Sequence, residues 1–262
     1  MNTTLSEGDD EDQEDSMAGD RFSQIYSQRT RIAGTTPGDD DLKGLVESER
    51  SAVLQARRAE RERQIKRYQR ASLAYIHSIL KSHPDDANDV WGQVVIKWLE
   101  GKLHGYNREY SFRKYLKEIL RNEVRAIYRN RQEEPERLGT EFDPQDEGHR
   151  SASSAFDDEY RNALLARAMN SVRQTDDRFF TLLQAQIDAS VNGQKEPRAS
   201  ALAELLDVTV DNARAIRKRA RDAYAKAILN EVREDLGTTD ADHVREALQD
   251  LGLEAYCRRV LE

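Results

Sequence analysis

The residues whose types and spacing best suit a chemical role are four cations, Arg214, Arg217, Lys218 and Arg221. Positions i, i+3, i+4 and i+7 share one face of an α-helix. Residues 212–226 hold six basic residues and one acid. Such a face can bind DNA phosphates and, from the major groove, base edges. A solvated helix face is the alternative, but the uniform sign and the turn that precedes the helix favour DNA.

A second concentration of positive charge spans 108–131, which contains eight basic residues and three acids. Aromatic residues are interleaved with these cations or lie beside them. Phe112 and Tyr115 are expected to be core residues, whereas Tyr106, Tyr110 and Tyr128 are candidates for stacking on bases. A basic groove with stacking side chains is typical of single-stranded nucleic-acid binding.

Catalysis finds no support in the sequence. The five histidines lack metal-ligand spacing, and the single cysteine, Cys257, cannot complete a metal site with them. No glycine-rich phosphate loop or nucleophile-elbow motif is present. We therefore predict a protein that is not an enzyme, with no catalytic residue, metal, cofactor or small-molecule substrate.

Helices are expected to position these residues, because glycine and proline are sparse and apolar residues recur at helical spacing. The predicted helices span 47–80, 86–100, 112–131, 160–172, 176–189, 200–206, 210–234 and 240–261. The short helix, the turn at 207–209 and the long helix form a helix-turn-helix pattern. In that motif Leu202, Leu205 and Val208 should pack on Ala213, Ile216 and Ala220. The predicted fold class is all-α.

Charge divides the chain of net charge −8 unevenly. The first 20 residues hold eight acids and no Lys or Arg, and residues 133–159 hold ten acids and two arginines. We predict an acidic disordered tail (1–46), a helical domain (47–132), a flexible acidic linker (133–159), a helix-turn-helix domain (160–234) and a helical C-terminal appendix (235–262). The acidic segments are expected to shield the two basic helices from non-specific DNA. The lone cysteine and the lack of a long apolar run or secretory signal indicate a cytoplasmic protein without a membrane span.

Two segments together resemble bacterial RNA polymerase sigma factors of the extracytoplasmic-function type. In the first, the matching features are Asp86-Ala87-x-Asp89-Val90, the aromatic loop, Ser111-Phe112-x-x-Tyr115-Leu116 and Arg121-Asn122 with the cations that follow. The second is 160–230, which is similar to the family's C-terminal domain and contains Arg219-Ala220-Arg221 near its end. The likeness covers about half of the chain. It implies a factor that binds core RNA polymerase and directs promoter recognition, DNA melting and transcription initiation.

The resemblance also implies roles for individual residues. A core-polymerase docking surface would comprise Asp86, Asp89, Val90, Gln93, Val94, Lys97 and Trp98. Capture of an unstacked base in promoter melting would involve Tyr106, Asn107, Tyr110, Lys117, Arg121, Asn122, Arg125 and Tyr128. The helix-turn-helix would read promoter DNA through Thr209, Asn212, Arg214, Arg217, Lys218 and Arg221. An anti-sigma factor is a further candidate partner.

This chain departs from the family pattern at two informative positions. Gly92-Gln93 stands where the family usually has Gln-Glu, and Asp207 stands where the turn usually has glycine. Asp207 fits only if it adopts the left-handed conformation. Two other functions stay open: a helix-turn-helix regulator that acts without polymerase, and a sigma-like interaction protein.

Overall fold

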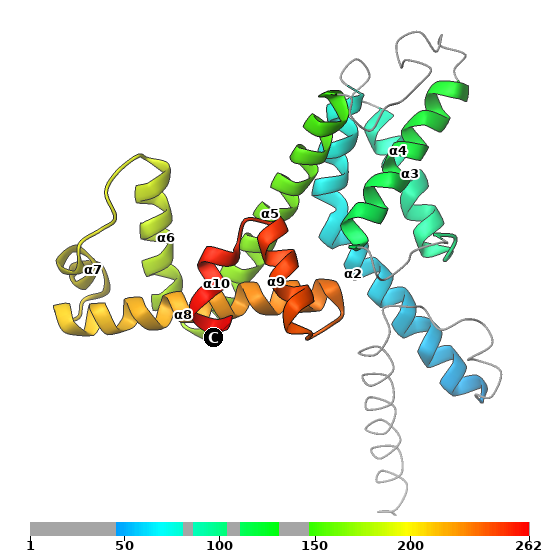
Figure 1. The fold of residues 1–262 in the computed structure, drawn as a ribbon. Helices are drawn as coiled ribbons and strands as arrows, with labels where there is room; N and C mark the ends of the chain where they lie inside the picture. Colours follow the sequence, from blue (N-terminus) through cyan, green and yellow to red (C-terminus); the bar gives the residue numbers. More distant parts are fainter. Residues whose placement is uncertain (1–45, 81–85, 104–110, 131–146, 262) are drawn as a thin grey trace, which may run out of the picture.

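The computed structural model describes residues 46–80, 86–103, 111–130 and 147–261. These residues form nine α-helices and no strand, which confirms the all-α class for the described part of the chain (Figure 1). The helices are α2 (Glu47–Ile79), α3 (Asp86–Leu99), α4 (Phe112–Asn130), α5 (Glu147–Thr175), α6 (Asp177–Val191), α7 (Ala199–Leu206), α8 (Val210–Leu236), α9 (Ala241–Asp250) and α10 (Glu254–Leu261).

Helices α2, α3 and α4 pack together at one end of the molecule (Figure 1). Val90, Val94 and Trp98 of α3 are at most 5% exposed. Their i, i+4, i+8 spacing places them on the face of α3 that meets α2 and α4. Phe112 of α4 closes this core, with its ring centroid 5.2 Å from that of Tyr68 and 5.2 Å from that of Trp98.

The predicted linker is wrong for 147–159, which forms the first half of α5. Ala152, Phe156 and Tyr160 recur every four residues and are at most 1% exposed. The acids between them pair with other helices: Asp157 lies 2.7 Å from the Lys117 ammonium, and Glu159 lies 3.1 Å from the Arg70 guanidinium. Partners distant in sequence thus stabilise a helix here. The rest of the predicted linker, 133–146, lies outside the described residues.

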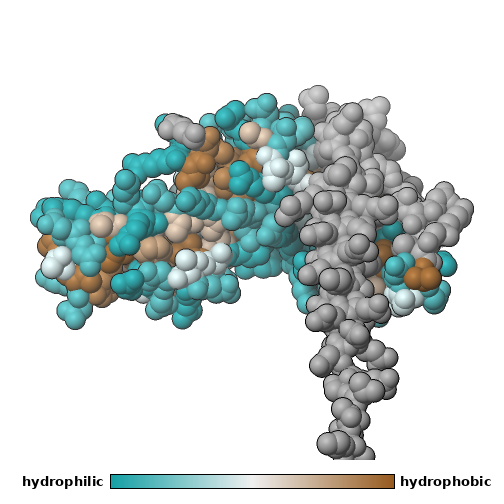
Figure 2. Space-filling view, turned by 90° about the horizontal axis from the view of Figure 1, so that it is seen from below, coloured by the Kyte–Doolittle hydropathy of each residue, from teal (hydrophilic) through white to brown (hydrophobic). Residues whose placement is uncertain are grey.

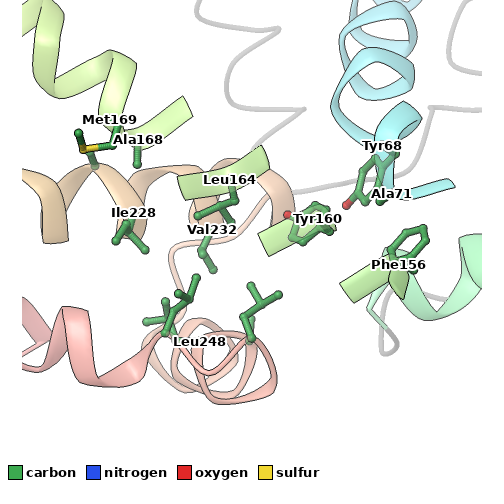
Figure 3. Close-up of a cluster of buried hydrophobic side chains, with 14 of the residues drawn as sticks. Tyr68, Ala71, Phe156, Tyr160, Leu164, Ala168, Met169, Ile228, Val232 and Leu248 are labelled. Carbon is green, nitrogen blue, oxygen red and sulfur yellow. The ribbon is translucent and has the colours of Figure 1, made fainter. Parts of the chain in front are cut away.

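Helix α5 connects the two halves of the core. Its first half packs on α2, where Tyr160 stacks on Tyr68 with 5.3 Å between ring centroids. Its second half packs on α6 and α8. Figure 3 shows the resulting run of buried side chains, from Tyr68 and Phe156 through Leu164 to Ile228, Val232 and Leu248. The two predicted domains therefore share one hydrophobic core instead of meeting through a flexible linker.

The C-terminal segment forms two short helices where the sequence suggested one. Asp240 caps α9 by accepting hydrogen bonds from the N–H groups of Asp242 and His243. Gly252 lies between α9 and α10 with φ +66°, a left-handed conformation that favours glycine. Cys257 is fully buried, and its Sγ lies 3.6 Å from the carbonyl oxygen of Ala225 on α8. The appendix is therefore part of the folded body.

Candidate nucleic-acid interface

Helices α7 and α8 form the predicted helix-turn-helix, and the turn depends on the backbone of Asp207. Asp207 has φ 49° and ψ 54°, which is the left-handed region. The N–H of Val208 donates to the carbonyl oxygen of Ala203 at 3.0 Å. Thr209 then caps α8, since its hydroxyl accepts from the N–H of Asn212 at 3.3 Å. Aspartate thus fills the glycine-type position and reverses the chain between the two helices.

The packing within the motif follows the prediction except at one leucine. Leu202, Ala213, Ile216 and Ala220 are at most 1% exposed, whereas Leu205 is 51% exposed. Leu202 and Leu206 are four residues apart and share a helix face, and Leu206 packs against the core. The prediction that Leu205 packs on α8 is therefore wrong, because its side chain is rotated away from that face.

The predicted DNA-contacting residues lie together on the N-terminal half of α8. Thr209, Asn212, Arg214, Lys218 and Arg221 are exposed, and Arg217 is half-exposed. The buried residues of this half, Ala213, Ile216 and Ala220, lie on the opposite side. This arrangement allows the cations to approach a phosphate backbone and base edges.

Carboxylates already balance three of these cations. Arg214 lies 2.7 Å from Asp211 on the preceding turn of α8. In the segment before α7, Glu196 pairs with Arg221, and its carboxylate oxygen lies 3.8 Å from the Arg217 guanidinium. Gln186 of α6 also donates to Glu196. The charge of Glu196 was not singled out from the sequence, because only the fold brings residues 25 positions apart together.

Apolar side chains are also exposed on this arm of the molecule. Val210, the first residue of α8, is 38% exposed, and Val191 at the end of α6 is 80% exposed. Figure 2 shows isolated hydrophobic patches among hydrophilic residues on the arm formed by α6–α8, at the left of the view. An exposed apolar residue at the start of a recognition helix can contact a thymine methyl group. Val210 was not among the predicted DNA-contacting residues, although an apolar residue at the start of a predicted recognition helix could have indicated such a contact.

The structure removes Lys117 from the predicted melting residues. Its ammonium donates to Ser153 at 2.8 Å and to Asp157 at 2.7 Å, and it lies 5.3 Å from the Phe156 ring centroid. Its side chain is only 16% exposed. Neighbouring Arg113 is 6% exposed and lies 5.2 Å from the ring centroid of Tyr160. Two cations of α4, Arg113 and Lys117, therefore stabilise its packing against α5.

The remaining melting candidates are only partly described. Asn122 is exposed, Arg125 is half-exposed, and the Arg121 guanidinium lies 2.9 Å from Glu118. Tyr106, Asn107 and Tyr110 lie outside the described residues, as does the side chain of Tyr128. Tyr115 is only half-buried and lies outside the core cluster, so its predicted place in the core is not confirmed. Partial burial raises the pKa of its phenol.

Three predicted docking residues are wrong for a surface role, because Val90, Val94 and Trp98 are core residues of α3. Asp89 and Gln93 are exposed, and Asp86 is half-exposed. Lys97 lies 2.5 Å from Glu123 of α4. The outer face of α3 borders an open groove against α4, lined by Asn88, Asp89, Gly92, Gln93, Ile96, Lys97, Glu123, Ala126 and Ile127.

Comparisons with known proteins return no match: no family model, curated protein or solved structure is similar to this chain. Within the described ranges, no group of three or more His, Cys, Asp or Glu residues could hold a metal ion. The helices that are described include none with the length and apolarity needed to cross a membrane.

Proposed function

We propose that this protein binds duplex DNA through α7 and α8. The observation that carries the proposal is the combination of a capped, left-handed turn at Asp207 with an exposed cationic face on α8. The turn fixes α8 against α7 through buried Leu202 and Ile216, so that the cations are presented by a rigid helix. Phosphate contacts by such cations position a protein on DNA, and base-edge contacts give sequence preference.

We further propose that this DNA-binding activity is that of a sigma factor acting in the cytoplasm. Promoter DNA and core RNA polymerase would be its partners, and the protein would be a non-catalytic subunit of the holoenzyme. The resemblance of 86–131 and 160–230 to the extracytoplasmic-function type supports this role. Among the residues that it implicates in docking, the exposed Asp89 and Gln93 are available to a polymerase surface.

In vitro transcription with core polymerase tests the proposal. The full chain is mixed with core enzyme and a DNA fragment from upstream of its own gene, and transcripts and co-elution with core are measured. We expect both, and we expect Asp89→Ala/Gln93→Ala to reduce co-elution while leaving duplex binding unchanged. The double variant Arg58→Ala/Arg63→Ala, in exposed residues of α2, is the control for general charge loss in DNA binding.

A regulator that acts without polymerase is the second candidate, and the exposed basic face of α8 supports it equally. Binding to duplex DNA without co-elution or transcripts would select this function over the sigma factor. A sigma-like interaction protein would give neither DNA binding nor transcripts. Loss of duplex binding in Arg214→Ala/Lys218→Ala, but not in Arg58→Ala/Arg63→Ala, would support either DNA-binding function.

A further inference from the structure

A second cationic site lies between α8 and the C-terminal helix α10. The open groove there is lined by Lys218, Asp222, Lys226, Arg259 and Val260. Lys218, Asp222 and Lys226 are spaced at i, i+4 and i+8, so they form one stripe along α8. Arg259 comes from α10, which lies against α8 in Figure 1. Three cations and a single carboxylate therefore border the groove.

Packing, and not charge, holds α10 in this place. Leu253, just before α10, is 1% exposed, and Cys257 is fully buried against the Ala225 carbonyl. Burial raises the pKa of the Cys257 thiol to about 11, as expected for a group enclosed by apolar neighbours. Arg258 and Arg259 follow Cys257 directly and are exposed. Their position beside α8 is thus set by the core.

The cations that line this groove differ in their pairing from the three arginines of the helix-turn-helix. Arg214, Arg217 and Arg221 each face a carboxylate. Lys218, Lys226 and Arg259 are exposed, and within the described part of the chain none of them forms an ion pair. An anion that enters the groove could therefore bind these three cations without breaking an existing ion pair.

We propose that this groove binds phosphate groups of the DNA backbone beside the site contacted by the N-terminal half of α8. Lys218 belongs to both surfaces, since it follows Arg214 by one helical turn. From Lys218 to Lys226 the helix rises about 12 Å, a length over which duplex DNA presents several phosphates. The C-terminal appendix thus extends the DNA interface, an inference that rests on the proposed DNA-binding function.

Salt-dependent binding to a random duplex tests the inference with the full chain. Lys226→Gln/Arg259→Gln should weaken binding about tenfold at low salt. It should also make the slope of log affinity against log salt shallower by about 1–2, because up to two phosphate contacts are lost. The preference of the protein for its own promoter over a random duplex should not change, because backbone contacts carry no sequence information.

Arg58→Gln/Arg63→Gln removes the same charge from exposed residues of α2 and is the matched control. Equal affinities and slopes for the two double variants would overturn the inference. If the groove instead binds a small phosphorylated molecule, tripolyphosphate will bind the parent protein but not Lys226→Gln/Arg259→Gln. The two proteins will then show the same salt dependence of DNA binding, and that result also overturns the inference. If the parent binds no duplex, both the proposed function and this inference fail. If Arg214→Ala weakens duplex binding while Lys226→Gln/Arg259→Gln has no larger effect than Arg58→Gln/Arg63→Gln, the proposed function stands and only the groove inference fails.

Discussion

Tyr68 of α2 donates a hydrogen bond of 2.5 Å from its phenol to the carboxylate of Asp235 near the end of α8, across 167 positions of sequence. Beside it, the Arg67 guanidinium lies 3.4 Å from Glu231 and 3.0 Å from Glu234. Because α8 begins in the helix-turn-helix and ends in this cluster, these contacts tie the candidate recognition helix to α2. The three N-terminal helices and the helix-turn-helix are thereby coupled through α8.

Replacing Arg67 should lower stability more than replacing an exposed arginine. The Arg67 side chain is 18% exposed, and it faces Asp235, which is 10% exposed, as well as Glu231. Arg67→Ala removes a positive charge that separates these carboxylates, so they repel one another more strongly. We expect the free energy of unfolding to fall by about 2 kcal/mol. Arg58, whose pair with Glu62 is exposed, is the control, and Arg58→Ala should cost less than about 1 kcal/mol. Urea denaturation measures both, and equal losses would refute the coupling.

Stability should fall above about pH 10, the ordinary pKa of a tyrosine. Burial and the neighbouring Asp235 carboxylate raise the pKa of Tyr68 and Tyr160 well above that value, and burial raises the pKa of Tyr75 and Tyr224 to about 12. Above pH 10 the unfolded chain releases protons that the folded chain keeps, so unfolding becomes easier as pH rises. Urea midpoints between about pH 8 and pH 11.5 test this, and Tyr68→Phe should flatten the decline. A constant midpoint over that range would contradict the expectation.

Helices α3, α5 and α8 show which parts of the fold could be predicted from the sequence and which could not. Helical periodicity was sufficient for α3 and α8, because each shows an apolar stripe that matches the core it meets. The start of α5 was missed because Asp157, Asp158 and Glu159 resemble a solvated linker. Two of them pair with distant residues, Asp157 with Lys117 and Glu159 with Arg70. Only the tertiary arrangement shows that basic residues of α2 and α4 neutralise these carboxylates.

The candidate site was predictable to the same degree. The turn at Asp207 and the outward cations of α8 follow from local spacing, which a sequence displays directly. The docking residues implied by the family likeness include Val90, Val94 and Trp98, although the i, i+4, i+8 spacing of these three already indicates the buried face of the helix. The pairing of Glu196 with Arg217 could not be predicted, because it depends on how the segment before α7 folds back toward α8.

Gly92 offers a way to stabilise α3. A Cβ built at this position has no heavy atom within 4 Å beyond its immediate neighbours, so alanine fits without a clash. Because glycine in a helix interior is less favourable than alanine, Gly92→Ala should raise the free energy of unfolding by up to about 1 kcal/mol. Thermal denaturation measures the change, with Ala126→Gly on the facing wall of the groove as the opposite substitution. A lower melting temperature for Gly92→Ala would contradict the open geometry of this face.

The left-handed conformation of Asp207 predicts an unusual order of stabilities. Glycine adopts φ 49° without strain, whereas a β-branched residue pays about 1–2 kcal/mol for it. Asp207→Gly should therefore equal or exceed the parent, and Asp207→Val should be clearly less stable. The control Glu204→Val, in an exposed position of helix α7, should cost only about 0.5 kcal/mol from helix propensity. Equal effects of the two valine substitutions would count against strain at the turn.

Glu196 should weaken DNA binding by competing with phosphates for arginine. It pairs with Arg221, and its carboxylate lies 3.8 Å from Arg217, so DNA must displace it to use both guanidinium groups fully. Glu196→Gln keeps a similar shape and removes the charge. We expect a several-fold gain in affinity for a random duplex at low salt. The slope of log affinity against log salt should become steeper by up to about 1–2, because the freed arginines make full phosphate contacts.

The change in net charge alone would also favour DNA, so the control must match it. Glu204 is exposed on α7, and no described residue forms an ion pair with its side chain. Glu204→Gln therefore removes the same charge from the same motif without releasing an arginine. The double variant Glu196→Gln/Arg221→Ala should return affinity toward that of the parent, because the released cation is then absent. If Glu196→Gln and Glu204→Gln strengthen binding equally, the competition between Glu196 and phosphate is disproved, since general electrostatics would account for both.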